Sequence, residues 1–156
     1  MSIQVNAFID ANHAHNKVTR RSHTGVLIYL NKAPIIWFSK SLRMVDTSTF
    51  GSEFIALKMS TELIKSLCYK LYIMGVPVDG PAKVLVDNNL VVRNSTIPST
   101  TLQKQHKAIC YHYVHENVAA KIICIAFIPS AKKLADMFTK LLGGMKLKSL
   151  CQRVLY

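Results

Sequence analysis

The stretch V-N-A-F-I-D at residues 5–10 sets the architecture of this chain, because apolar and polar side chains roughly alternate along it and it ends in an acid. Alternation with a period of two predicts a β-strand. A second run, V-L-V-D at residues 84–87, also ends in an acid and predicts a short buried strand of a mixed sheet. A carboxylate in an apolar setting is costly unless a cation compensates it, so Asp10 and Asp87 indicate cationic partners.

The composition is that of one basic globular domain. The chain has 156 residues and a formal net charge of +12, from 20 Lys+Arg and 8 Asp+Glu. This charge favours a polyanionic partner, because each phosphate that a lysine neutralises releases condensed counterions. The lysines are spread over many segments, which disfavours a membrane-bound helix. No apolar run could span a bilayer and no signal-peptide pattern is present, so we expect an intracellular, cytoplasmic protein without a membrane partner.

The hydrophobic pattern predicts the element order β-β-β-α-β-α-β-α. Helix caps are predicted at Thr47–Thr49, at Ser99 or Thr100, and at Ser130, while Gly143-Gly144 is expected to end the last helix. Residues 94–101 are expected to form a loop. The predicted strands are residues 4–10, 24–31, 33–40, 82–87 and 121–129, and the predicted helices run from about 49 to 74, 102 to 118 and 130 to 142.

Four acids lie in apolar settings on separate segments: Asp10, Glu53, Asp87 and Asp136. Carboxylates from a strand, a helix, a strand and a helix suit a two-metal phosphodiesterase, because Mg²⁺ prefers oxygen ligands. Paired ions ~4 Å apart clamp the attacking and leaving oxygens of such a reaction. The alternative is four unrelated acids, which is the better interpretation of each acid alone. Their combination with the order of the surrounding motifs favours a metal site.

Short motifs follow one another along residues 5–143, and their order is more specific than any one of them. They are I-D-A-N, R-R-S-H-T-G, I-I-W-F-S-K, T-S-T-F-G-S-E-F, V-D-N-N, Q-H-K-A-I-C-Y-H-Y-V-H-E and A-D-M-F-T-K. This series resembles the ribonuclease H domain that closes the polyprotein of copia-type (Pseudoviridae) retrotransposons. The resemblance implies a ribonuclease H-like α/β fold over residues 1–144, with a five-stranded mixed sheet of three antiparallel and two parallel strands flanked by helices. Residues 145–156 would form a basic C-terminal tail of undetermined conformation.

The resemblance also implies a mechanism. Asp10 would bridge two metal ions, Glu53 and Asp87 would share the second ion, and Asp136 would help to hold the first. The implied cofactors are two Mg²⁺ ions, with Mn²⁺ as a possible substitute. The implied activity is endonucleolytic cleavage of the RNA strand in an RNA–DNA hybrid during reverse transcription, within or beside a reverse transcriptase polyprotein and in a virus-like particle if the element is active.

Three departures from the family pattern concern substrate contacts and proton handling. Asn12 and His13 stand where the family has Asp and Trp, and E-A-E-Y is reduced to S-E-F, so that Glu53 is the glutamate available. Cellular ribonucleases H carry a histidine in the loop before the last acid, whereas this chain has P-S-A-K-K at residues 129–133 and in this respect resembles the retrotransposon family. The resemblance therefore leaves proton transfer to the leaving group unexplained.

A second set of polar residues is predicted to contact nucleic acid. Arginine forks match phosphate oxygens, and asparagine side chains can reach the 2′-hydroxyls that distinguish RNA from DNA. Ordinary surface and turn positions are the alternative. The candidates for contact with nucleic acid are Asn12, Arg20, Arg21, Ser22, Asn88 and Asn89.

His106 and Trp37 are expected in the core.

Two other functions stay open at this point. The first is a degenerate remnant that keeps the fold and binds nucleic acid without cutting, which Asn12 and His13 favour and the four intact acids disfavour. The second is an integrase or resolvase core of the same fold superfamily, which the A-D-M-F-T-K ending disfavours.

Overall fold

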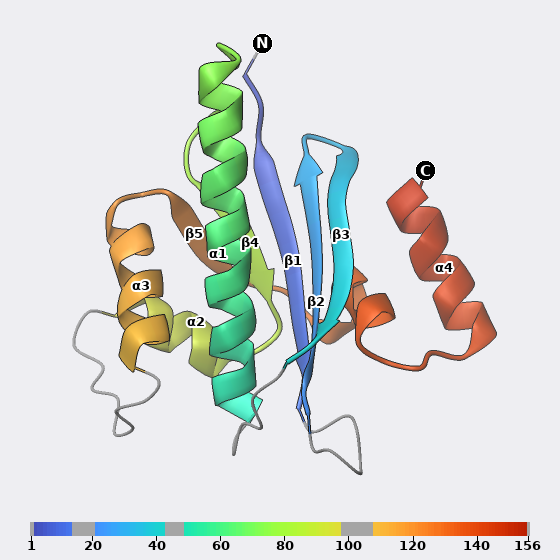
Figure 1. Ribbon diagram of the computed structural model, residues 1–156. Coiled ribbons are helices and arrows are strands. Elements are labelled where there is room, and N and C mark those ends of the chain that lie inside the picture. Colours follow the sequence, from blue (N-terminus) through green and yellow to red (C-terminus); the bar gives the residue numbers. More distant parts are fainter. Residues whose placement is uncertain (1, 14–20, 43–48, 98–107, 156) are drawn as a thin grey trace.

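Five strands form one mixed sheet in the computed structural model, which describes residues 2–13, 21–42, 49–97 and 108–155 (Figure 1). Strands β1 (Val5–Asn12), β2 (His23–Leu30) and β3 (Ala33–Ser41) form an antiparallel meander. Strands β4 (Ala82–Val86) and β5 (Ile123–Phe127) continue the sheet in parallel on the other side of β1. The order β3-β2-β1-β4-β5 confirms the predicted sheet of three antiparallel and two parallel strands.

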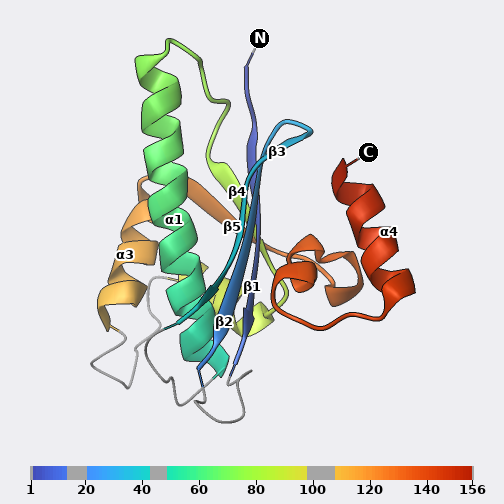
Figure 2. The same ribbon diagram turned by 45° about the vertical axis from the view of Figure 1, so that its right-hand side comes forward.

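Helices cover both faces of the sheet (Figure 2). Helices α1 (Thr49–Ile73), α2 (Asn89–Thr96) and α3 (Ala108–Ala119) lie on one face and contact one another. The opposite face carries the short 3-10 helices η2 (Ser130–Lys132) and η3 (Leu134–Phe138) and then α4 (Gly144–Leu155). None of the described helices combines the length and apolar character that crossing a bilayer requires.

The alternation along β1 determines which face its acid uses. Val5, Ala7 and Ile9 are buried in the main core between the sheet and α1. Phe8 points to the other face, where it packs on a smaller cluster formed by Leu27, Tyr29, Leu134 and Leu150. Because successive side chains of a strand point to opposite faces, Asp10 lies on the same face as Phe8, toward η3.

The sheet opens where the pairing between β1 and β4 ends. Their parallel register runs from Asn6↔Lys83 to Phe8↔Leu85, two residues before Asp10 and Asp87 respectively. Ligand sites of open α/β sheets lie outside the carboxyl ends of the strands, where the chain diverges. Both acids therefore stand at the edge of such an opening.

Three predictions about the secondary structure were wrong. Residues 89–96 form helix α2, although residues 94–101 were expected to be a loop; Asn88 caps the helix by accepting a hydrogen bond from the backbone N–H of Leu90 at 2.9 Å. The helix expected after Ser130 is broken into η2 and η3 at Lys133, which has extended backbone. Gly144 begins a helix instead of ending one, so the expected tail is α4, with Leu150 buried in the smaller cluster. Other predictions lie outside the described residues. They are the caps proposed at Thr47, Ser48, Ser99 and Thr100 and the core position proposed for His106.

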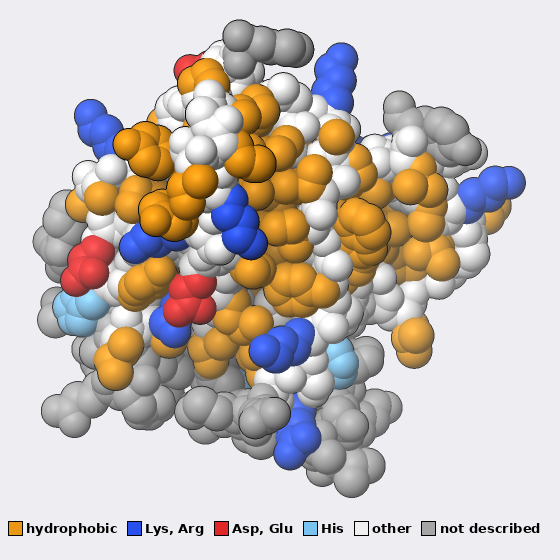
Figure 3. Space-filling view, turned by 45° about the horizontal axis from the view of Figure 1, so that its top comes forward, with side chains coloured by type: hydrophobic (Ala, Val, Ile, Leu, Met, Phe, Trp, Pro, Cys, Tyr) orange, Lys and Arg blue, Asp and Glu red, His pale blue; other side chains and the backbone are white. Residues whose placement is uncertain are grey.

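On the face seen in Figure 3, Lys and Arg side chains are scattered among hydrophobic ones and form no concentrated basic patch.

The expected core position of Trp37 was wrong, since 60% of this residue is exposed. The physical reason is that Trp37 lies on β3, an edge strand of the sheet with mostly exposed or partly exposed positions.

Gly25 allows η3 to lie against the sheet. This glycine pairs with Asp10 in the register of β1 and β2. A Cβ atom at Gly25 would lie 2.7 Å from Cβ of Phe138, 2.9 Å from Cγ2 of Thr139 and 3.0 Å from the carbonyl oxygen of Ala135. The close approach that brings η3 beside Asp10 therefore requires the absence of a side chain at this position.

We predict that Gly25→Ala destabilises the protein by roughly 1–3 kcal/mol, because the added methyl group overpacks a rigid contact. Urea unfolding of the variant beside the wild type measures the change. Gly143→Ala is the matched control, since nothing lies within 4 Å of a Cβ atom there. Equal stability of the two variants would contradict the argument.

Candidate metal centre

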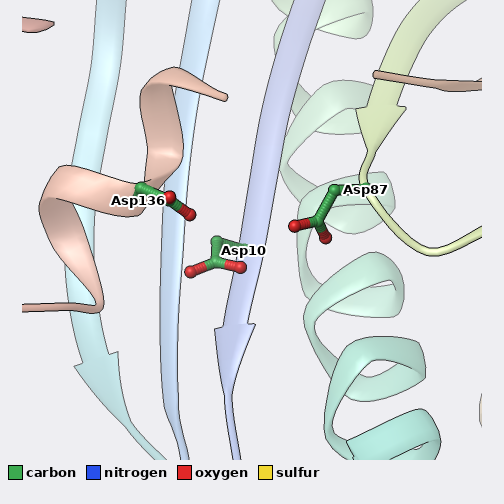
Figure 4. A group of neighbouring side chains, drawn as sticks. All are labelled: Asp10, Asp87 and Asp136. Atoms are coloured by element: carbon green, nitrogen blue, oxygen red, sulfur yellow. The ribbon is translucent and has the colours of Figure 1, made fainter. Parts of the chain in front are cut away.

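Three carboxylates from distant parts of the chain converge (Figure 4). Asp10 is on β1, Asp87 directly follows β4, and Asp136 lies within η3. One oxygen of each lies within 4.8 Å of the others. Asp10 and Asp136 are only 4% and 3% exposed. Three of the four predicted acids thus lie close enough together to share a cation.

Glu53 stands at the margin of this group. It lies near the start of α1 and lines the same small hollow as Asp10 and Asp87, but it is outside the set of mutually close oxygens. Its Oε2 atom is buried and has no hydrogen-bond partner among the described residues. Burial raises the pKa of Glu53 above its ordinary value, and the charges of Asp87 and Asp10 raise it further, although an Asn88 hydrogen bond and the Lys133 charge act in the opposite direction.

Lysines compensate the clustered carboxylates, and the sequence interpretation missed them. Lys133 donates from Nζ to Oδ1 of Asp10 and to Oδ1 of Asp87, both at 2.5 Å, and it is 2% exposed. Lys140 donates to Oδ1 of Asp136 at 2.9 Å, and its ammonium lies 3.8 Å from Oδ2 of Asp10. The T-K of A-D-M-F-T-K was an available signal for Lys140, whereas the buried position of Lys133 follows only from the tertiary fold.

Hydroxyl groups complete the contacts of the carboxylates. Thr139 donates its hydroxyl hydrogen to Oδ2 of Asp10, and Ser130 donates to Oδ2 of Asp87 at 3.2 Å. Burial alone would raise the pKa of Asp10, but Lys133, Thr139 and Lys140 together hold that pKa below its ordinary value. Asp10 is therefore a stably ionised carboxylate at neutral pH.

The residues predicted to contact nucleic acid differ in their exposure and in their contacts. Arg21 and Asn89 are exposed, and Arg20 lies outside the described residues. Ser22 is fully buried, so its hydroxyl cannot reach a phosphate in this conformation. Asn12 donates from its side chain to the carbonyl oxygen of Thr139 at 3.0 Å. The side chain of Asn88 caps α2 and is also hydrogen-bonded to Glu53.

The residues present fit divalent ions. Four carboxylates supply only oxygen ligands, which hard cations such as Mg²⁺ prefer. Around them, the ammonium groups of Lys133 and Lys140 are in ion-pair contact, and Lys146 lies 3.9 Å from Asp136. Glu53 lines the same hollow, and its Oε2 atom is a further acceptor without a hydrogen-bond partner among the described residues. Cations are thus the ligands that this group of side chains requires.

The fold is that of ribonuclease H. The N-terminal ribonuclease H domain of a Mycobacterium tuberculosis protein, solved as a fusion with maltose-binding protein, has a TM-score of 0.63, with 14% identity over 97% of this chain and 98% of that chain. LC11-RNase H1 in complex with an RNA/DNA hybrid has a TM-score of 0.66, with 17% identity over 87% of this chain and 94% of that chain. A foamy viral protease-reverse transcriptase in complex with an RNA/DNA hybrid has a TM-score of 0.58, with 13% identity over 88% of this chain and 19% of that chain.

In sequence the chain is similar to two Arabidopsis thaliana proteins, the retrovirus-related Pol polyproteins from transposons RE1 and RE2. The identities are 24% and 22% over 153 residues, which is 98% of this chain. The matched region is 10% of the length of each polyprotein. No protein-family model matches the chain. The resemblance to retrotransposon ribonuclease H domains is confirmed by these relatives together with the fold.

We predict that Glu53→Gln stabilises the metal-free protein at neutral pH. A carboxyl group whose folded pKa is raised opposes folding once the pH exceeds its unfolded pKa, because the unfolded state ionises more readily. The gain is expected to be fully present above the folded pKa of Glu53 and to vanish below about pH 4, where both states hold the proton. Urea unfolding in EDTA at several pH values measures it. Glu116→Gln, at an exposed site, is the control, and a gain that does not depend on pH would refute the prediction.

Proposed function

We propose that this chain is the ribonuclease H segment of a retrotransposon polyprotein and cleaves the RNA strand of an RNA–DNA hybrid with two divalent ions, Mg²⁺ or Mn²⁺. The observation that carries the proposal is the convergence of Asp10, Asp87 and Asp136, with ligand oxygens within 4.8 Å. The similarity to transposon Pol polyproteins and to ribonuclease H structures solved with hybrid supports the same substrate.

The assignment of ligands follows from the two sides of Asp10. The ammonium group of Lys133 links Oδ1 of Asp10 to Asp87. The other oxygen of Asp10, Oδ2, lies toward Asp136 and Lys140. Asp10 would therefore bridge both ions, with Glu53 and Asp87 on one side and Asp136 on the other. Bound ions at such a site supply an activated water and neutralise charge at the phosphorus.

Other side chains would orient the hybrid and the ligands. Arg21, exposed just before β2, and Asn89, exposed at the start of α2, are the available candidates for the hybrid backbone. Asn12 acts indirectly, since it holds the carbonyl group of Thr139, whose hydroxyl group contacts Asp10. Asn88 orients Glu53 in the same indirect way. The +12 charge of the chain supports attraction to the polyanionic substrate.

One observation favours the alternative of a hybrid-binding protein that does not cut. Lys133 and Lys140 already neutralise the carboxylates on both sides of Asp10, as cations would. A protein that had lost the use of metal ions could retain such ion pairs for stability. Binding and cleavage must therefore be measured separately.

We expect the purified protein to cut the RNA strand of a labelled RNA–DNA hybrid with Mg²⁺ or Mn²⁺, and to leave DNA duplex and RNA duplex intact. EDTA should abolish cleavage. Asp10→Asn should lower the rate by at least roughly a hundredfold, because it weakens the shared ligand of both ions. Denaturing gels of end-labelled strands measure cleavage, and fluorescence anisotropy measures binding.

Asp79→Asn is the matched control, because Asp79 is an exposed acid remote from the cluster. It should cut as fast as the wild type. Hybrid binding without metal-dependent cleavage would reject the nuclease and support the non-cutting alternative. Equal cleavage of DNA duplex would reject the hybrid as the specific substrate.

A further inference from the structure

The ammonium group of Lys133 occupies the space between the ends of β1 and β4. It lies 2.5 Å from one oxygen of Asp10 and 2.5 Å from one oxygen of Asp87, and so bridges the two carboxylates as a single cation. The side chain is 2% exposed, which makes it one of the few buried charges of the described residues. A buried ammonium is retained only where carboxylates compensate its lost hydration.

The hollow around this ammonium is small, and the ammonium already takes the oxygens that an ion between Asp10 and Asp87 would need. The volume of the hollow is about 10 Å³, close to the least that holds one water molecule. Apolar side chains complete the wall next to the acids, among them Ile9, Ala56 and Val86. A divalent ion bound to the same oxygens would also be repelled by the ammonium at short range. Lys133 and an ion therefore exclude each other from this position.

The other side of Asp10 differs. Lys140, which contacts Asp136 there, is 40% exposed, and its long side chain can turn into solvent. Because Lys140 keeps contact with solvent, its ammonium loses less hydration in this ion pair than the ammonium of Lys133 does in its own. An ion can thus replace Lys140 between Asp10 and Asp136 at small cost, whereas replacing Lys133 requires the withdrawal of a buried side chain.

We propose that Lys133 is a built-in cation that holds the position between Asp10 and Asp87, so that the free protein takes one divalent ion, between Asp10 and Asp136. A second ion enters only when Lys133 withdraws. The inference rests on the proposed function in taking these acids as metal ligands, but it does not require cleavage. It assigns Lys133 as the residue that determines metal stoichiometry.

Mn²⁺ binding tests this proposal. The number of bound ions is measured by isothermal titration calorimetry for the wild type, Lys133→Met and Lys132→Met. Electron paramagnetic resonance measures the concentration of free Mn²⁺ in the same titrations. We expect one ion in the wild type and two in Lys133→Met, with the second bound roughly tenfold or more tightly than any second ion of the wild type. Lys132→Met is the matched control: it removes a neighbouring but exposed lysine and should bind one ion.

Thermal unfolding gives a second readout. In EDTA, Lys133→Met should unfold roughly 5–15 °C below the wild type, because two carboxylates lose their partner, and Mn²⁺ should restore most of the loss. If Lys133→Met does not fold without metal, Lys133→Arg keeps the charge and should bind one ion. A wild type that binds two ions with similar affinity overturns the proposal whatever the variants do.

The outcomes separate this proposal from the proposed function. One ion in the wild type and two in Lys133→Met, without cleavage of hybrid, would support the inference and reject the nuclease. Hybrid cleavage by a wild type that binds two ions equally well would support the nuclease and reject the inference. Failure to bind Mn²⁺ at all would reject both.

Discussion

Repulsion between like charges is the constraint on which this structure depends. Asp10, Asp87 and Asp136 bring ligand oxygens within 4.8 Å of one another, two of them from side chains that are almost fully buried. Such a group is stable only with cations among the oxygens. Lys133 supplies a buried one and Lys140 an exposed one.

The scaffold brings these charges together through simple packing rules. Alternation along β1 places Asp10 on the face opposite to α1, and the end of the β1–β4 register leaves space beside it. Gly25, opposite Asp10 on β2, lets η3 approach closely enough for Thr139 to contact the acid. Loss of any of these features would separate Asp10 from Asp136, which are more than a hundred residues apart in the chain.

The two sides of Asp10 differ in accessibility, and this asymmetry connects structure to function. On one side the compensating ammonium is 2% exposed, and on the other it is 40% exposed. A nuclease built on this site would therefore depend on metal concentration in a way that the four acids alone do not indicate. An RNA–DNA hybrid bound at this site would add phosphate charge. That charge would change the competition between the lysines and metal ions for the carboxylates.

The sequence was sufficient to predict the five strands, the long helix and the three acids that converge, because periodicity and strand ends are local properties of the chain. It also contained a signal for α2, the cap at Asn88, although Asn88 is predicted as a nucleic-acid contact with a turn position as the alternative. The broken helix after Ser130, the exposure of Trp37 and the burial of Lys133 were decided only by tertiary structure. The reason is physical: burial of a lysine depends on carboxylates 46 and 123 residues away, and no local pattern encodes that distance.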